Sequence, residues 1–214
     1  EETKASGRQQ DVERLLERVS RPDRKLTIIY GRSGVGKSSL VNAGLVPALQ
    51  RMPIGTREGN PLVVRVYTDW MGVLAAQLDI PAEERAFVNS ERLLQELQRQ
   101  SDRRKLTVLI FDQFEEFFFV CLNPRERREF YDFLRDCLNL AFVNVMLSIR
   151  EDYLHYLLEC DRLTNLEVVD NDILNKNVRY YLGHFSPEDA RNVIHRLTER
   201  SYFELESNLI DELV

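Results

Sequence analysis

The stretch that decides the fold runs from Leu26 to Leu40 and reads L-T-I-I-Y-G-R-S-G-V-G-K-S-S-L. Residues 31–38 match G-x-x-x-x-G-K-[ST], the pattern of a loop that wraps the phosphates of a nucleoside triphosphate. An apolar, β-rich run precedes the loop, and an amphipathic helical pattern follows it as far as Leu49. The sequence therefore predicts a strand, a phosphate-binding loop and a helix in succession.

The residue types in this loop suit phosphate. Its three glycines let the backbone approach the ligand closely, with amide N–H groups pointing inward. The N-terminus of the following helix adds a partial positive charge. We expect Lys37 to reach the β- and γ-phosphates, Ser38 to ligate Mg²⁺ and Ser39 to contact the α-phosphate. The residues predicted to bind the nucleotide here are Gly31, Arg32, Ser33, Gly34, Val35, Gly36, Lys37, Ser38 and Ser39.

The bulk composition excludes several classes of partner. The chain has 214 residues and a formal net charge of −6, which gives no general electrostatic case for nucleic acid or an anionic membrane. The longest apolar run, Phe117–Leu122, is too short to span a bilayer. Cys121, Cys137 and Cys160 are widely spaced, as in a cytoplasmic protein with reduced thiols. We expect no membrane and no nucleic-acid partner.

Strand patterns alternate with helical patterns along the chain, which favours an α/β fold with a mostly parallel five-stranded sheet and helices on both faces. The strands are expected at residues 26–30, 62–67, 106–111, 143–149 and 178–182. We expect a loop at 52–60 and a helix opening at Ser186. The chain lacks an initial Met and ends within an amphipathic pattern. We therefore expect a fragment, with an ATPase core at 1–185 and the start of a truncated helical lid at 186–214.

A nucleotide site needs a carboxylate for the metal and its water shell, at the end of an apolar strand. The run at 106–111 ends in Asp112, our candidate Mg²⁺ partner. Glu115 or Glu116 would orient and deprotonate the attacking water. The alternative is a helix whose first turn carries acids to suit its dipole. Sequence does not decide which of the two glutamates faces the site.

Arg150 ends the next strand, where a cation would contact the γ-phosphate and report its loss. The alternative is a surface arginine paired with a neighbouring acid, since Glu151 and Asp152 follow. The aromatic run at 114–119 also has two possible interpretations. It is either an oligomer interface or the core-facing side of a helix. Arg103, Arg104 and Arg128 are candidates for an arginine supplied to a second copy.

Several segments together carry a family resemblance. They are Gly7-Arg8 before a helical pattern, Y-G-R-S-G-V-G-K-S-S-L-V-N-A-G-L-V-P-A-L at 30–49, L-I-F-D-Q-F-E-E-F-F at 109–118, S-I-R-E-D-Y-L at 148–154 and F-S-P-E-D-A-R at 185–191. This order resembles the STAND class of P-loop ATPases, and more narrowly the novel STAND domains of bacterial signalling proteins. The resemblance covers nearly the whole chain.

The resemblance implies an additional-strand P-loop fold with sheet order 5-1-4-3-2, and ATP or ADP with Mg²⁺ as ligands. It implies a switch in which ADP holds a closed monomer and ATP permits self-association and activation of an effector. Sensor and effector domains would lie outside this fragment. By the same resemblance, Lys37 and Ser38 belong to Walker A, Asp112 to Walker B with Glu115 and Glu116 beside it, Arg150 is sensor 1, and Gly7 and Arg8 border the adenine.

Three other functions stay open at this point. The phosphate loop also resembles that of guanylate-kinase-like small-molecule kinases, although D-Q-F-E-E does not look like an acceptor site. A GTPase usually carries N-K-x-D, but the nearest string, Asn175-Lys176-Asn177-Val178, lacks the aspartate. An interaction module that binds nucleotide without turnover would have the same binding residues. The function that we prefer as a hypothesis is a signalling switch with slow ATP hydrolysis.

Overall fold

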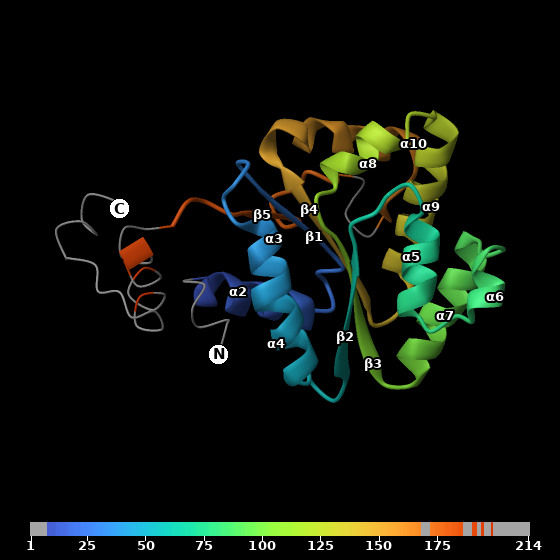
Figure 1. The fold of residues 1–214 in the computed structure, drawn as a ribbon, viewed down its shortest axis with the longest axis horizontal. Coiled ribbons are helices and arrows are strands. Elements are labelled where there is room, and N and C mark those ends of the chain that lie inside the picture. Colours follow the sequence, from blue (N-terminus) through green and yellow to red (C-terminus); the bar gives the residue numbers. More distant parts are fainter. Residues whose placement is uncertain (1–7, 168–171, 186–189, 192–193, 195–197, 199–214) are drawn as a thin grey trace.

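The computed structural model describes residues 8–167, 172–185, 190–191, 194 and 198 (Figure 1). Within these residues, five strands form one parallel sheet in the order β2-β3-β4-β1-β5. This is the predicted order read from the opposite edge, so the predicted fold is confirmed. The strands are β1 (Leu26–Gly31), β2 (Glu58–Val64), β3 (Lys105–Phe111), β4 (Val143–Arg150) and β5 (Arg179–Tyr181).

Helices connect the strands and cover the sheet. They are α2 (Gln9–Ser20), α3 (Lys37–Ser39), the π-helical η1 (Leu40–Leu45), α4 (Val46–Arg51), α5 (Trp70–Gln77), α6 (Ala82–Arg85), α7 (Ser90–Asp102), α8 (Glu115–Val120), α9 (Pro124–Asn139), the 3₁₀-helical η2 (Glu151–Leu157) and α10 (Leu158–Leu163). The helix predicted at 37–51 is thus continuous, with one π-helical segment. Among the described residues, no helix is long and apolar enough to cross a membrane.

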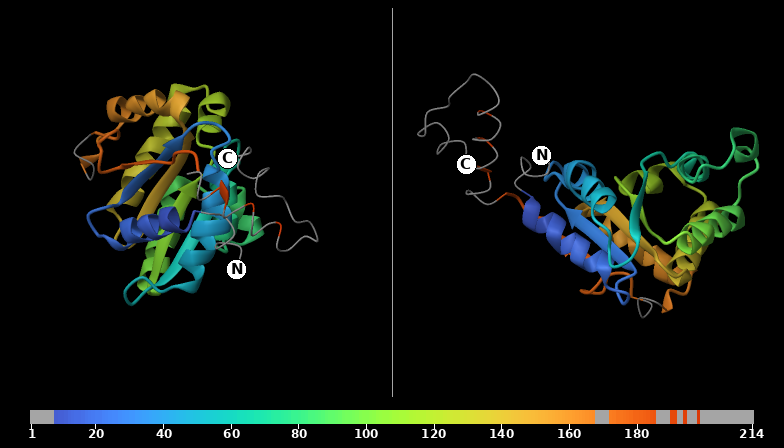
Figure 2. Two further views of the ribbon diagram at one scale, coloured as in Figure 1. Left: turned by 90° about the vertical axis from the view of Figure 1, so that its left-hand side faces the viewer. Right: turned by 90° about the horizontal axis from the view of Figure 1, so that it is seen from below.

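The central strands are apolar on both sides because helices pack against both faces of the sheet. Ile28 points into one core and Ile29 into the other, as the two-residue period of a strand requires. One core lies beneath α2, η1 and α4, and the other beneath α5, α7 and α9. Figure 2 shows these two groups of helices on opposite sides of the sheet.

The second strand starts and ends earlier than predicted, because Glu58 already pairs with Lys105 and the ladder stops at Val64. The predicted loop at 52–60 is correspondingly shorter. Gly59 belongs in this strand because a Cβ there would lie 2.1 Å from the carbonyl oxygen of Leu49. Pro61 is tolerated because β2 is an edge strand. The helix predicted at Ser186 and the proposed boundary at 185/186 fall on residues that the structure does not describe.

The aromatic run at 114–119 faces the core. Phe114 and Phe117 are fully buried and stack with their ring centroids 5.0 Å apart, and Phe118 is buried beside them. Phe119, by contrast, is 52% exposed. The core-facing interpretation therefore holds for three of the four phenylalanines. These rings hold α8 against the sheet, and α8 carries Glu115 and Glu116.

Phe130 of α9 is the centre of this aromatic cluster, with ring centroids 4.6 Å from Phe117, 5.1 Å from Phe111 and 5.3 Å from Trp70. We predict that Phe130→Ala lowers the free energy of unfolding by about 3–5 kcal/mol, because it removes buried area and leaves a cavity. Urea denaturation measures this loss. Phe119→Ala is the matched control and should cost less than about 1 kcal/mol. Equal losses in the two variants would contradict the described core.

Candidate active site

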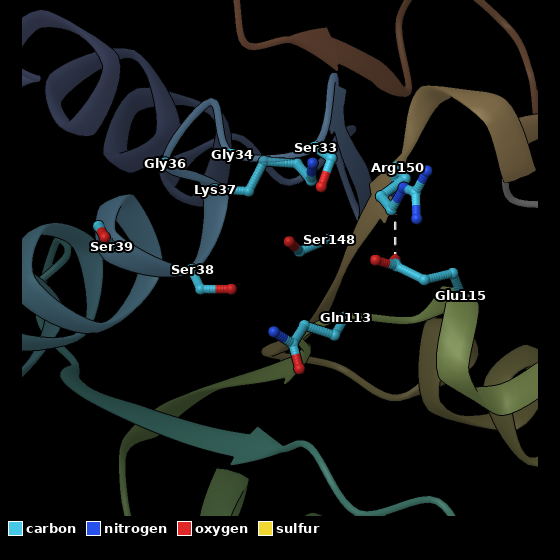
Figure 3. A pocket seen from close by; sticks show the side chains of 10 residues that line it. All are labelled: Ser33, Gly34, Gly36, Lys37, Ser38, Ser39, Gln113, Glu115, Ser148 and Arg150. Carbon is cyan, nitrogen blue, oxygen red and sulfur yellow. Dashed lines mark hydrogen bonds between the residues drawn. The ribbon is translucent and has the colours of Figure 1, made fainter.

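A cavity of about 290 Å³ opens at the carboxyl ends of β1, β3 and β4 (Figure 3). Ligands bind at this edge in parallel α/β sheets. Its lining consists of Ser33, Gly34, Gly36, Lys37, Ser38, Ser39, Gln113, Glu115, Ser148 and Arg150. The structure thus brings together, from separate segments of the chain, most of the residues that the sequence singled out.

The phosphate loop depends on glycine for two different reasons. Gly36 has φ of 95°, in the left-handed region, and directly precedes α3. Gly31 ends β1 so close to the chain after β5 that a Cβ would lie 2.3 Å from the carbonyl oxygen of Leu182. Arg32 is exposed and pairs with Glu151 at 3.3 Å. The loop is therefore held at its start by packing and at its end by backbone conformation.

The side chain of Lys37 folds back over this loop. Its Nζ donates hydrogen bonds to the carbonyl oxygens of Gly31 and Arg32, at 2.9 Å each. Burial lowers the pKa of Lys37, and the nearby carboxylate of Glu115 opposes that shift. The ammonium group therefore lies at the mouth of the loop, where the oxygens of a triphosphate would enter.

Asp112 follows β3 and is fully buried. Its Oδ1 accepts hydrogen bonds from Ser38 Oγ and from the backbone N–H of Gln113, both at 3.1 Å. Neighbouring oxygen ligands of octahedral Mg²⁺ lie about 3 Å apart, so a hydroxyl and a carboxylate at this separation suit the ion and its water shell. The donor set fits Mg²⁺, with Ser38 and Asp112 as the residues that would hold it.

The two adjacent glutamates lie in different surroundings. Glu115 is 7% exposed, lines the cavity, and accepts a hydrogen bond on Oε2 from the backbone N–H of Arg150 at 3.2 Å (Figure 3). Glu116 is exposed and is not part of the lining. The sequence does not distinguish Glu115 from Glu116 as the catalytic carboxylate. Because only Glu115 lines the cavity, we take Glu115 as the candidate.

The surroundings of Arg150 are compatible with both interpretations of its position. Its side chain lines the cavity, as a γ-phosphate contact requires. It also pairs with a neighbouring acid, since Nη2 donates to Asp152 Oδ2 at 2.7 Å, and this hydrogen bond raises the pKa of the guanidinium. The guanidinium carbon lies 5.2 Å from the ring centre of Tyr153. A contact with phosphate would compete with the Asp152 pair.

Two residues of the cavity lining, Ser148 and Gln113, were not predicted from the sequence. Ser148 Oγ is buried and has no hydrogen-bond partner within the described part of the chain. A buried hydroxyl without a partner costs about 1–3 kcal/mol, so this atom fits a site where a ligand oxygen or water arrives. Its position two residues before Arg150 on the same strand was a usable signal. Gln113 has φ of 56°, a strained conformation that no sequence pattern announces.

Of the Gly7-Arg8 segment, the structure describes only Arg8. Gly7 lies outside the described residues. Arg8 is buried, and its Nη2 donates to the carbonyl oxygens of Val35 at 2.9 Å and Gly183 at 2.8 Å. Its guanidinium also lies 4.1 Å from the ring centre of Phe185. Arg8 therefore ties the phosphate loop to the segment after β5, and its contact with adenine stays a prediction.

The fold matches several solved structures. The Walker-type ATPase paby2304 of Pyrococcus abyssi superposes with a TM-score of 0.67 at 16% identity, over 97% of this chain and 62% of that one. The Aeropyrum pernix ORC2 protein in its ADP form gives 0.66 at 14%, over 94% and 54%. The Aeropyrum pernix ORC1 protein, solved in complex with DNA, gives 0.61 at 16%, over 90% and 49%. At these identities the likeness shows the fold alone, and the chain spans about half to three-fifths of each relative.

The family follows from sequence. No curated protein matches the chain. The family model described as Novel STAND NTPase 1 matches residues 4–214, nearly the whole chain. With the phosphate loop, the acidic strand end and the parallel sheet already in place, this match is decisive, and the chain belongs to the novel STAND NTPase 1 family.

Proposed function

We propose that this chain is the ATP-binding, slowly hydrolysing regulatory module of a larger STAND-type protein, whose nucleotide state controls self-association and the output of an effector. The observation that carries the proposal is the convergence of the phosphate loop, the Asp112–Glu115 segment and Arg150 on one cavity. Family membership supports ATP or ADP as the ligand.

Binding rests on the loop and its lysine. The backbone amides between Gly31 and Ser38 would surround the phosphates, and Lys37 would exchange its two carbonyl acceptors for phosphate oxygens. A magnesium ion held through Ser38 and Asp112 would neutralise charge on the β- and γ-phosphates. Ser148 Oγ, which lines the same cavity, offers a further donor.

Hydrolysis rests on Glu115. Its carboxylate is buried at the cavity and fixed by the N–H of Arg150, so it can orient a water for in-line attack on the γ-phosphate and accept its proton. Arg150 would stabilise the charge on the γ-phosphate. After the γ-phosphate leaves, the guanidinium would be left with Asp152, the acid with which it pairs here. Arg150 can thus distinguish the two nucleotide states.

Lys37→Ala should abolish measurable nucleotide binding, because the phosphates lose their charged partner, a loss of about 2–5 kcal/mol. Titration of a fluorescent ADP analogue, followed by anisotropy, measures the effect. The matched control is Lys176→Ala, which removes an exposed lysine outside the cavity lining and should bind as the unaltered chain does. Retained binding in Lys37→Ala would place the nucleotide elsewhere.

Glu115→Gln should keep nucleotide affinity and slow ATP hydrolysis by about a hundredfold or more, because the amide cannot accept the proton of the attacking water. Glu116→Gln is the adjacent control and should leave the rate unchanged. Single-turnover release of phosphate measures both. If neither variant changes the rate, neither glutamate is the catalytic carboxylate. Tightly held ADP with no measurable turnover in the unaltered chain would instead support the non-hydrolysing module.

The same variant tests the switch. Glu115→Gln would accumulate the ATP-bound state, so light scattering of this variant with ATP and with ADP compares the two states directly. A larger mass with ATP supports nucleotide-controlled self-association. Identical masses in the full-length protein would contradict it.

A further inference from the structure

Arg65 contacts Asp112, the carboxylate proposed to hold the metal ion. The proposed mechanism gives no role to this contact. Arg65 directly follows β2, and the pairing of Val64 with Phe111 places it beside Asp112. Its Nε and Nη2 donate to Asp112 Oδ2 at 2.9 and 2.6 Å. The side chain of Arg65 is 46% exposed, whereas that of Asp112 is fully buried.

This contact completes the hydrogen bonding of Asp112. Oδ1 accepts from Ser38 Oγ and the N–H of Gln113, and Oδ2 accepts twice from Arg65. A carboxylate has about four lone-pair sites, so four donors fill them. The arginine also supplies the opposite charge that a fully buried carboxylate needs. Asp112 is therefore satisfied and neutralised before any metal ion arrives.

A divalent cation at Ser38 and Asp112 is attracted by the negative charge of that carboxylate, and Arg65 offsets this charge from the other oxygen. The two cations repel one another across a single carboxylate. Because the side chain of Arg65 is half-exposed and directly follows the edge strand β2, it can turn towards water without a change in the sheet. Arg65 is thus placed to compete with the metal.

We propose that Arg65 is a resident counter-cation of Asp112 that weakens divalent metal binding in the ADP-bound state. The metal is then held firmly only when a γ-phosphate adds its own negative charge. Arg65 would in this way tie metal retention to the nucleotide state. This inference deepens the proposed function and rests on it.

The test uses Mn²⁺ as the probe, with free Mn²⁺ counted by electron paramagnetic resonance in the presence of saturating ADP. Arg65→Gln removes the competing charge and should bind Mn²⁺ about tenfold tighter or more. Arg65→Lys keeps the charge but loses one hydrogen bond to Asp112. Its affinity for Mn²⁺ should lie between that of the unaltered chain and that of Arg65→Gln. Arg99→Gln is the matched control, because the half-exposed Arg99 pairs with the nearly buried Glu96 outside the cavity lining. The Mn²⁺ affinity of this variant should not change.

A second measurement separates competition from misfolding. Without divalent cations, Arg65→Gln should melt several degrees below the unaltered chain, because Asp112 loses its partner. Mn²⁺ with ADP should then raise its melting temperature more than that of the unaltered chain. Equal or weaker Mn²⁺ binding by Arg65→Gln would overturn this inference and leave the proposed function intact. If the unaltered chain binds neither ADP alone nor Mn²⁺ in the presence of ADP, the inference about Arg65 and the proposed function are both wrong.

Discussion

The site depends on the parallel pairing of β4 with β1 on one side and with β3 on the other. Because all three strands run in the same direction, their carboxyl ends meet at one edge of the sheet. The phosphate loop leaves β1, Asp112 follows β3, and Arg150 ends β4. Segments more than one hundred residues apart are thereby brought to one cavity. Antiparallel insertion of any one of these strands would remove its residue from the site.

Charge balance is the second constraint. Two buried carboxylates, Asp112 and Glu115, lie beside the cavity, and neither is left without a donor. Tyr67 adds to the environment of Asp112, since its hydroxyl donates to the backbone oxygen of Asp112 at 2.8 Å and burial beside these acids raises its pKa well above the usual range. The ammonium group of Lys37 donates to two carbonyl oxygens of the phosphate loop. The groups that would meet a charged ligand are thus held in place by protein contacts.

The strand–loop–helix unit at Leu26–Leu40 and the sheet order were predictable, the first from its motif and hydrophobic pattern and the second from the family resemblance. Asp112 and Arg150 were predictable because each ends an apolar strand. The choice of Glu115 over Glu116 was not, since it depends on the direction of α8 from the sheet. Arg65 was missed because β2 was placed too late along the chain. Gln113 was missed because a positive φ outside glycine leaves no sequence signal.

The central claim is that the cavity beside the phosphate loop holds an adenine nucleotide. The most direct measurement is to denature the freshly purified protein, separate the released small molecules by chromatography, and titrate ADP and GDP into protein freed of them. We expect adenine nucleotide in the released fraction, or preferential binding of ADP if the purified protein carries no nucleotide. Released guanine nucleotide, or preferential binding of GDP, would contradict the assignment of the base. Binding of neither nucleotide would contradict the site itself.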